Sequence, residues 1–97
     1  MIELSQKDLL IVKKILSAHV ATYRVWAFGS RVNGKTKKHS DLDLVIITEK
    51  PIPTLTLALL KEDFSESDLP IKVDILDWAT LDENFKKIIL QKHEVIT

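Results

Sequence analysis

The chain has 97 residues, which is the size of one domain, so we expect residues 1–97 to fold around a single core. Hydrophobic residues make up 45% and charged residues 29% of a chain with only two glycines and three prolines, a composition that excludes a disordered or fibrous protein. Fourteen basic residues balance fourteen acidic ones, which excludes bulk electrostatic binding of nucleic acid as the main function.

The chain contains no cysteine, which excludes disulfides, thiolate nucleophiles and cysteine-bound zinc. Its N-terminus lacks the pattern of a signal peptide, and no apolar run approaches the roughly 18 residues of a membrane span. We therefore expect a cytoplasmic protein with no membrane partner. A chain this short buries only roughly 60–65% of its unfolded surface, so association into a homo- or hetero-oligomer would add stability.

A helix and a strand open the chain. Ser5 and Asp8 have the spacing of a capping box, and apolar residues then recur at helical spacing, which predicts a helix over residues 6–21. Residues 23–28 are rich in aromatic and branched side chains and are followed by Gly29, which predicts a short strand.

A loop, a second strand and a second helix follow. Residues 30–40 are polar and basic and contain an Asn-Gly turn, which predicts a loop with room for one helical turn after Ser30. The nearly continuous apolar run over 42–48 predicts a central strand with both faces covered. Residues 54–64 contain good helix formers, although alternating leucines leave a strand as the competing interpretation; we favour the helix.

The last part of the chain is predicted to form a third strand and a final helix. Apolar residues alternate over 71–76, which predicts the strand. Thr80 and Glu83 have the spacing of a second capping box, and a helical pattern then continues to about His93. The predicted order is α-β-β-α-β-α, an α+β fold in which helices flank a small mixed sheet.

Two carboxylates open the second predicted strand. Asp41 and Asp43 are two residues apart, so strand geometry sends both side chains to one face. Such a pair repels itself, and bound Mg²⁺ offsets that repulsion. Alone, an Asp-x-Asp pair is more often a solvated strand entrance than a metal site. Gly29 and Ser30 change this balance, because glycine allows close backbone approach and N–H groups with a serine hydroxyl can bind a phosphate.

The composite pattern, Gly29-Ser30, ten further residues and then Asp41-x-Asp43, resembles the minimal nucleotidyltransferases of the DNA polymerase beta superfamily. In that family the Gly-Ser pair binds the triphosphate, the paired aspartates hold two Mg²⁺ ions, and a third carboxylate on a later strand completes the site. Asp74 matches that third position, on the strand face opposite its core-facing neighbours. The resemblance covers nearly the whole chain and implies a nucleotidyltransferase-like fold.

Other polar residues are alternative or additional candidates for this site. Asp77 is a rival third carboxylate, but its core-facing parity indicates that it caps or turns the strand end. Arg31 directly follows the Gly-Ser pair and is predicted to bind phosphate. A solvated basic loop explains the remaining candidates at least as well, namely Lys35, Lys37 and Lys38.

The histidines and tryptophans give weaker signals. No histidine spacing indicates a zinc site; His19 fits a structural role, and His39 is the histidine near the proposed site. Trp26 and Trp78 are predicted to pack in or beside the core, with base stacking by Trp78 as a less favoured alternative.

The resemblance implies an Mg²⁺-dependent nucleotidyltransferase that uses a nucleoside triphosphate, most simply ATP, with Asp74 also able to act as the base toward an acceptor hydroxyl. Family members of this size often occur with a HEPN-domain protein, as the antitoxin of a toxin–antitoxin pair that modifies a tyrosine on the toxin. The alternative is a binding module that neutralises its partner by occlusion, which the carboxylate set disfavours. A glycosyltransferase with an Asp-x-Asp motif is excluded because 97 residues cannot supply that fold.

Overall fold

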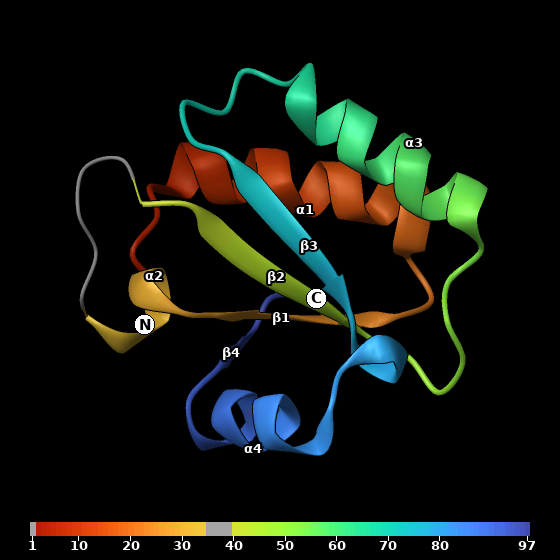
Figure 1. Cartoon of the computed structure of the whole chain (residues 1–97). Helices are drawn as coiled ribbons and strands as arrows, with labels where there is room; N and C mark the ends of the chain where they lie inside the picture. The colour runs from red at the N-terminus through yellow and green to blue at the C-terminus, as the bar shows by residue number, and fades with distance from the viewer. Residues whose placement is uncertain (1, 35–39) are drawn as a thin grey trace.

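The structure is a computed structural model that describes residues 2–34 and 40–97. Its four strands are β1 (Arg24–Phe28), β2 (Leu42–Ile47), β3 (Val73–Asp77) and β4 (Glu94–Val95). They form one mixed sheet in the order β3-β2-β1-β4 (Figure 1). Strand β1 is antiparallel to β2 and to β4, whereas β2 and β3 are parallel.

Helices cover both faces of this sheet. They are α1 (Gln6–Val20), α2 (Ser30–Asn33), α3 (Thr54–Ser65), the 3₁₀ helix η1 (Trp78–Thr80) and α4 (Glu83–Gln91). Figure 1 shows α1 and α3 side by side on one face and α4 on the other. This arrangement confirms the predicted α+β fold. Within the described residues, no helix combines the length and the apolar character needed to cross a bilayer.

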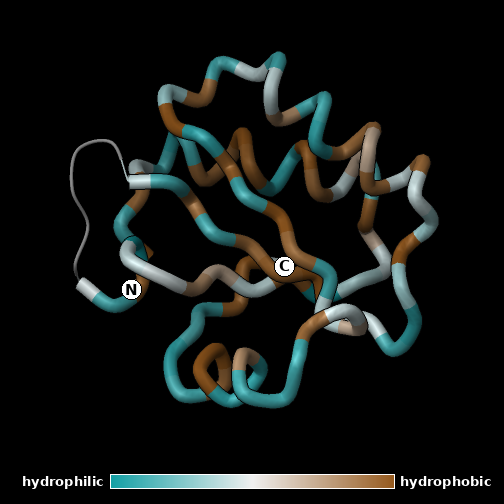
Figure 2. The backbone as a smooth tube through the Cα atoms, viewed as in Figure 1, coloured by the Kyte–Doolittle hydropathy of each residue, from teal (hydrophilic) through white to brown (hydrophobic). Residues whose placement is uncertain are grey.

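The main core lies between the sheet and helices α1 and α3. Leu42, Leu44 and Ile46 of β2 are fully buried in that core. Val45 alternates with them and is fully buried as well, which confirms that both faces of β2 are covered. Figure 2 shows hydrophobic residues along the strands.

The predicted helices of the first two thirds of the chain agree with the structure. Helix α1 begins after Ser5, whose hydroxyl accepts a hydrogen bond from the Asp8 N–H at 3.1 Å, as the capping box predicts. One helical turn follows Gly29, and α3 is helical rather than extended. His19 Nε2 lies 2.9 Å from Asp63 Oδ2, so this histidine links α1 to α3 and has the structural role predicted for it.

The C-terminal segment differs from the prediction in two respects. Asp82, not Thr80, is the N-cap of α4, and its carboxylate accepts a hydrogen bond from the Phe85 N–H at 2.8 Å. Thr80 instead ends η1, where its hydroxyl donates to the carbonyl of Asp77. The chain also continues past α4 into β4, which pairs with β1. A strand of two residues is too short for alternation to reveal it, so the predicted element order lacked it.

Candidate active site

Gly29 allows the end of β1 to approach β2 closely. It follows Phe28 and adopts φ 79° and ψ −155°, a conformation that residues with a side chain rarely adopt. A Cβ at this position would lie 3.3 Å from the carboxyl carbon of Asp43 and would collide with one of its oxygens. Only glycine therefore fits beside this carboxylate without displacing it. Ser30 comes next and is the first residue of α2.

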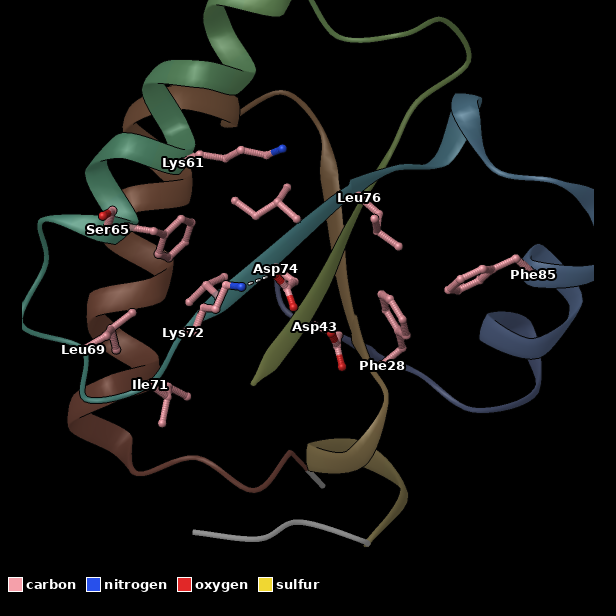
Figure 3. Close-up of a pocket in the computed structure, with 13 residues that line it drawn as sticks. Phe28, Asp43, Lys61, Ser65, Leu69, Ile71, Lys72, Asp74, Leu76 and Phe85 are labelled. Carbon is pink, nitrogen blue, oxygen red and sulfur yellow. Dashed lines mark ion pairs between the residues drawn. The ribbon is translucent and has the colours of Figure 1, made fainter. Parts of the chain in front are cut away.

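Three residues form a row across the sheet. Phe28 of β1 pairs with Asp43 of β2 in antiparallel register, and Asp43 pairs with Asp74 of β3 in parallel register. Residues paired in this way place their side chains on the same face of the sheet. Figure 3 shows Asp43 and Asp74 next to each other at the centre of one pocket, with Phe28 beside Asp43. The structure thus brings two of the three predicted carboxylates together.

The carboxylates of this row repel one another. Burial raises the pKa of Asp43 above its ordinary value, and the negative charges of Asp74 and Asp41 raise it further. The surroundings of Asp43 therefore oppose its negative charge. A bound cation relieves such repulsion and favours the ionised carboxylates.

Asp41 lies two residues before Asp43, just outside β2, and is partly buried. In the part of the chain that the structure describes, no three His, Cys, Asp or Glu side chains gather closely enough to form a metal-binding group. The residues nevertheless fit Mg²⁺, because magnesium usually binds through one or two carboxylates together with waters and substrate phosphates. Asp43 and Asp74 supply a carboxylate pair of this kind.

The two carboxylates line a pocket of about 900 Å³. Phe28 and Phe85 also line it and meet edge to face, with ring centroids 5.9 Å apart. Lys61 of α3 points into the pocket, and Lys72 Nζ lies 3.8 Å from Asp74 Oδ1 (Figure 3). Sequence reasoning missed this lining because no local motif marks it. The packing of α3 and α4 against the sheet brings Lys61 and Phe85 to this pocket.

Arg31 joins two backbone segments, and the phosphate-binding role stays a prediction. The side chain is buried; its Nε donates to the carbonyl of Ser40 at 3.0 Å, and one terminal nitrogen donates to the carbonyl of Glu3 at 2.7 Å. The guanidinium therefore holds the N-terminal segment against the entrance of β2. The other residues of the predicted basic loop lie outside the described residues, namely Lys35, Lys37, Lys38 and His39.

Asp77, the rival third carboxylate, is a structural cap. It is buried and accepts hydrogen bonds from the Thr48 hydroxyl, from the Ile52 N–H at 2.7 Å and from the Ala79 N–H at 3.3 Å. These bonds hold the end of β3 to the connection that follows β2. The prediction that Asp77 caps the strand end is confirmed.

The two tryptophans pack together with a histidine. Trp26 and Trp78 meet edge to face with ring centroids 5.6 Å apart, and the ring of His93 stacks on Trp26 at 4.0 Å. Lys86 Nζ lies 5.5 Å from the centre of the Trp78 ring. These contacts confirm the packing role predicted for both tryptophans.

A family model covers most of the chain. It is described as polymerase beta, nucleotidyltransferase, and it matches residues 11–97. The chain belongs to this nucleotidyltransferase family. Membership agrees with the resemblance seen in Gly29, Ser30, Asp41 and Asp43, and it makes the chain a nucleotidyltransferase.

Two named relatives of this nucleotidyltransferase are similar over most of their length. A Haemophilus influenzae protein named probable protein adenylyltransferase MntA is 56% identical over 95 residues, which cover 98% of this chain and 83% of the relative. Protein adenylyltransferase MntA of Thermococcus cleftensis is 30% identical over 88 residues, which cover 84% of this chain and 88% of the relative.

Solved structures share the fold of this nucleotidyltransferase. A toxin–antitoxin crystal structure with AMP-PNP matches with a TM-score of 0.76 and 17% identity, over 92% of this chain and 72% of that chain. A tri-AMPylated HEPN toxin of Shewanella oneidensis in complex with an MNT antitoxin matches with a TM-score of 0.69 and 15% identity, over 95% of this chain and 71% of that chain. At these identities the likeness establishes the nucleotidyltransferase-like fold that the sequence predicts.

Proposed function

We propose that the chain is an antitoxin that transfers AMP from ATP to a hydroxyl group of a HEPN-domain toxin. The observation that carries the proposal is the pairing of Asp43 with Asp74 across β2 and β3, with Gly29 packed closely against the Asp43 carboxylate. The 56% identity to a probable protein adenylyltransferase supports AMP as the transferred group and a protein as the acceptor. The shared fold with a HEPN toxin–MNT antitoxin complex supports the choice of partner.

The proposed reaction is an in-line substitution at the α-phosphorus of ATP. The acceptor oxygen forms a bond to the α-phosphorus, the bond from that phosphorus to the oxygen bridging the β-phosphate breaks, and pyrophosphate leaves. We assign Asp74 to accept the hydroxyl proton, because β3 is at the edge of the sheet and Asp74 lines the pocket there. We assign the triphosphate to Gly29 and Ser30 at the start of α2, where glycine lets a phosphate approach the backbone N–H groups.

Mg²⁺ is the cation that suits this carboxylate pair. Asp43 and Asp74, with Asp41, would hold two Mg²⁺ ions in the arrangement that the resemblance implies. The bound ions would supply positive charge to the triphosphate and to the departing pyrophosphate. The carboxylates must be ionised to hold the cation, so AMP transfer should fall as pH decreases through the raised pKa of Asp43. Because ATP is the proposed donor, we place the reaction in the cytoplasm.

Label transfer from ATP tests this proposal. The purified chain is mixed with a HEPN-domain toxin, Mg²⁺ and ATP labelled at the α-phosphate. We expect Mg²⁺-dependent labelling of the toxin, reduced by about 100-fold or more in Asp43→Asn and in Asp74→Asn, since each removes a carboxylate assigned to the reaction. Asp68→Asn is the matched control, because it removes an exposed carboxylate that does not line the pocket.

The same assay separates the alternatives. Undiminished labelling by both Asp43→Asn and Asp74→Asn contradicts the assigned site. If the toxin is neutralised without labelling, equally by the unmodified chain and by Asp43→Asn, the chain is a binding module that acts by occlusion.

A further inference from the structure

The pocket beside Asp74 runs along the outer edge of the sheet. Strand β3 is an edge strand, and across residues 2–34 and 40–97 no strand pairs with its outer side. Six consecutive residues, 71–76, line the pocket, although successive side chains of a strand point to opposite faces. A pocket that is lined from both faces must follow the edge itself, where a strand presents unpaired backbone groups.

The outward backbone groups of this edge belong to Val73 and Ile75. The carbonyl of Lys72 accepts a hydrogen bond from the Leu42 N–H at 2.9 Å, so Lys72 and, by alternation, Asp74 direct their backbone groups toward β2. The N–H and C=O groups of Val73 and Ile75 consequently point away from β2. An extended chain that lies in the pocket can pair with them.

We propose that an extended segment of the acceptor protein adds to this edge as a fifth strand and thereby brings its hydroxyl group to Asp74. The inference rests on the proposed function and specifies how the acceptor binds. Phe28, Asp43 and Asp74 already form a row of paired residues. In an added strand, about 4.8 Å beyond β3, the residue opposite Asp74 continues this row. Its side chain then lies on the face that carries both carboxylates, where the reaction requires a hydroxyl.

The two sides of the pocket favour different side chains in the added segment. On the side away from the carboxylates, Phe64 of α3 and Leu69 form an apolar lining. On the side of Asp74, Lys72 lies two residues away on the same face. The segment should therefore carry apolar residues on both sides of the hydroxyl residue and an acidic residue two positions away.

Electrostatics favour an acceptor segment over a second copy of this chain. Two copies paired through β3 would bring their Asp43 and Asp74 rows together across the new strand pair. Like charges opposite each other destabilise a strand pair, and burial already opposes the charge on Asp43. An acceptor segment with a neutral hydroxyl and flanking acids instead complements Lys72.

Hydrogen exchange of the full chain, followed by NMR, tests the added strand. The probe is the peptide acetyl-Glu-Val-Tyr-Val-Glu-amide. In a strand added antiparallel to β3, its two valines would exchange backbone hydrogen bonds with Val73 and Ile75 when the tyrosine lies opposite Asp74. The matched control peptide carries N-methyl groups on both valines, which removes the pairing N–H groups and keeps the side chains. We expect the first peptide to slow exchange of the Val73 and Ile75 amides by about tenfold or more, and the control to leave it unchanged.

A substitution tests the same edge from the side of the protein. Val73→Pro removes an outward N–H, and proline is tolerated at the first residue of an edge strand. Val73→Ala is the control, because it shortens the side chain and keeps the N–H. We expect peptide affinity to fall by up to about tenfold more in Val73→Pro than in Val73→Ala, the effect of one lost hydrogen bond. Thermal melting of both variants verifies that they are folded, and the N-methylated peptide tests the edge without any substitution.

Three results would overturn the proposal. The first is equal exchange of the Val73 and Ile75 amides with the two peptides, or no change in either amide at the solubility limit of the probe. The second is protection that grows with protein concentration in the absence of peptide, which identifies a second copy as the occupant. The third is labelling of the toxin by a complex in which these two amides still exchange freely; that result removes the added strand and leaves the proposed AMP transfer intact.

Discussion

The surroundings of Asp43 oppose a negative charge on its carboxyl group. Burial raises its pKa, and Asp74 and Asp41 add like charge. The folded state therefore binds this proton more tightly than the unfolded state does. As a result, the contribution of Asp43 to the free energy of unfolding falls as pH rises from the ordinary aspartate pKa, about 3.9, through the raised value. At neutral pH and without a cation, this carboxylate destabilises the fold.

Asp43→Asn is expected to raise the free energy of unfolding at pH 7, because it removes this repulsion, and to give no gain near pH 3. The gain should stay below about 1 kcal/mol, since solvent screens a carboxylate that is only half-buried. Urea titration at the two pH values, without divalent cations, measures the effect. Asp68→Asn is the control for an exposed carboxylate, and a loss of stability in Asp43→Asn at pH 7 would contradict the inferred repulsion.

Gly29→Ala is expected to destabilise the chain and to abolish AMP transfer. The backbone conformation of Gly29 costs about 1–3 kcal/mol for a residue with a side chain, and the added methyl group would push the Asp43 carboxylate out of the row. Gly34→Ala is a matched control: Gly34 has a φ of 80°, but a Cβ there meets no atom of residues 2–34 and 40–97 within 4 Å. Thermal melting and the labelling assay distinguish the two variants. Retention of transfer in Gly29→Ala, at the level of Gly34→Ala, would show that the close approach is not needed.

At the scale of the elements, the junction after β3 depends on one buried carboxylate. Asp77 accepts hydrogen bonds from Thr48 and Ile52, in the segment after β2, and from Ala79 in η1. It thereby fixes where β3 ends and where η1 begins. The carboxylate of Asp77 is occupied by these hydrogen bonds. Asp74 is the carboxylate of β3 that lines the pocket with Asp43.

Asp77→Ala is expected to lower the free energy of unfolding by about 2–4 kcal/mol, because it leaves buried donors of Thr48 and Ile52 without an acceptor. Asp82→Ala removes the exposed N-cap of α4 and should cost only about 1 kcal/mol. Urea unfolding of the two variants, side by side, measures the difference. A loss in Asp77→Ala no greater than that in Asp82→Ala would contradict the role given to the buried cap.

Local sequence patterns predict the elements that are long enough to repeat their apolar spacing several times. Helix α1 and strand β2 show several repeats of apolar spacing, and both were found close to their observed bounds. The start of α4 was misplaced because Thr80 and Asp82 are both acceptable N-caps, and the choice depends on η1, which Asp77 positions through a tertiary contact. The structural contacts of Arg31 could not be predicted for a similar reason. Its partners, the carbonyls of Glu3 and Ser40, are distant in sequence and carry no side-chain signal.

At the scale of the whole molecule, the sequence marks the candidate site residues but not the space around them. A composite motif marks Gly29, Ser30, Asp41 and Asp43, and strand parity marks Asp74. The pocket depends on the packing of α3 and α4 on opposite sides of β3, which no local pattern encodes (Figure 1). The unpaired outer side of β3 likewise follows from the strand order β3-β2-β1-β4, which is a property of the assembled sheet.

A crystal structure of the chain with Mg²⁺ and an ATP analogue tests the central claim most directly. The analogue carries a methylene group in place of the oxygen between the α- and β-phosphates, so AMP cannot be transferred. The paired carboxylates predict Mg²⁺ bound to Asp43 and Asp74, with the α-phosphate at the same ion and the triphosphate beside Gly29. An analogue bound with its magnesium away from both carboxylates, or seated at another face of the sheet, would contradict the assignment of this row as the site of nucleotidyl transfer.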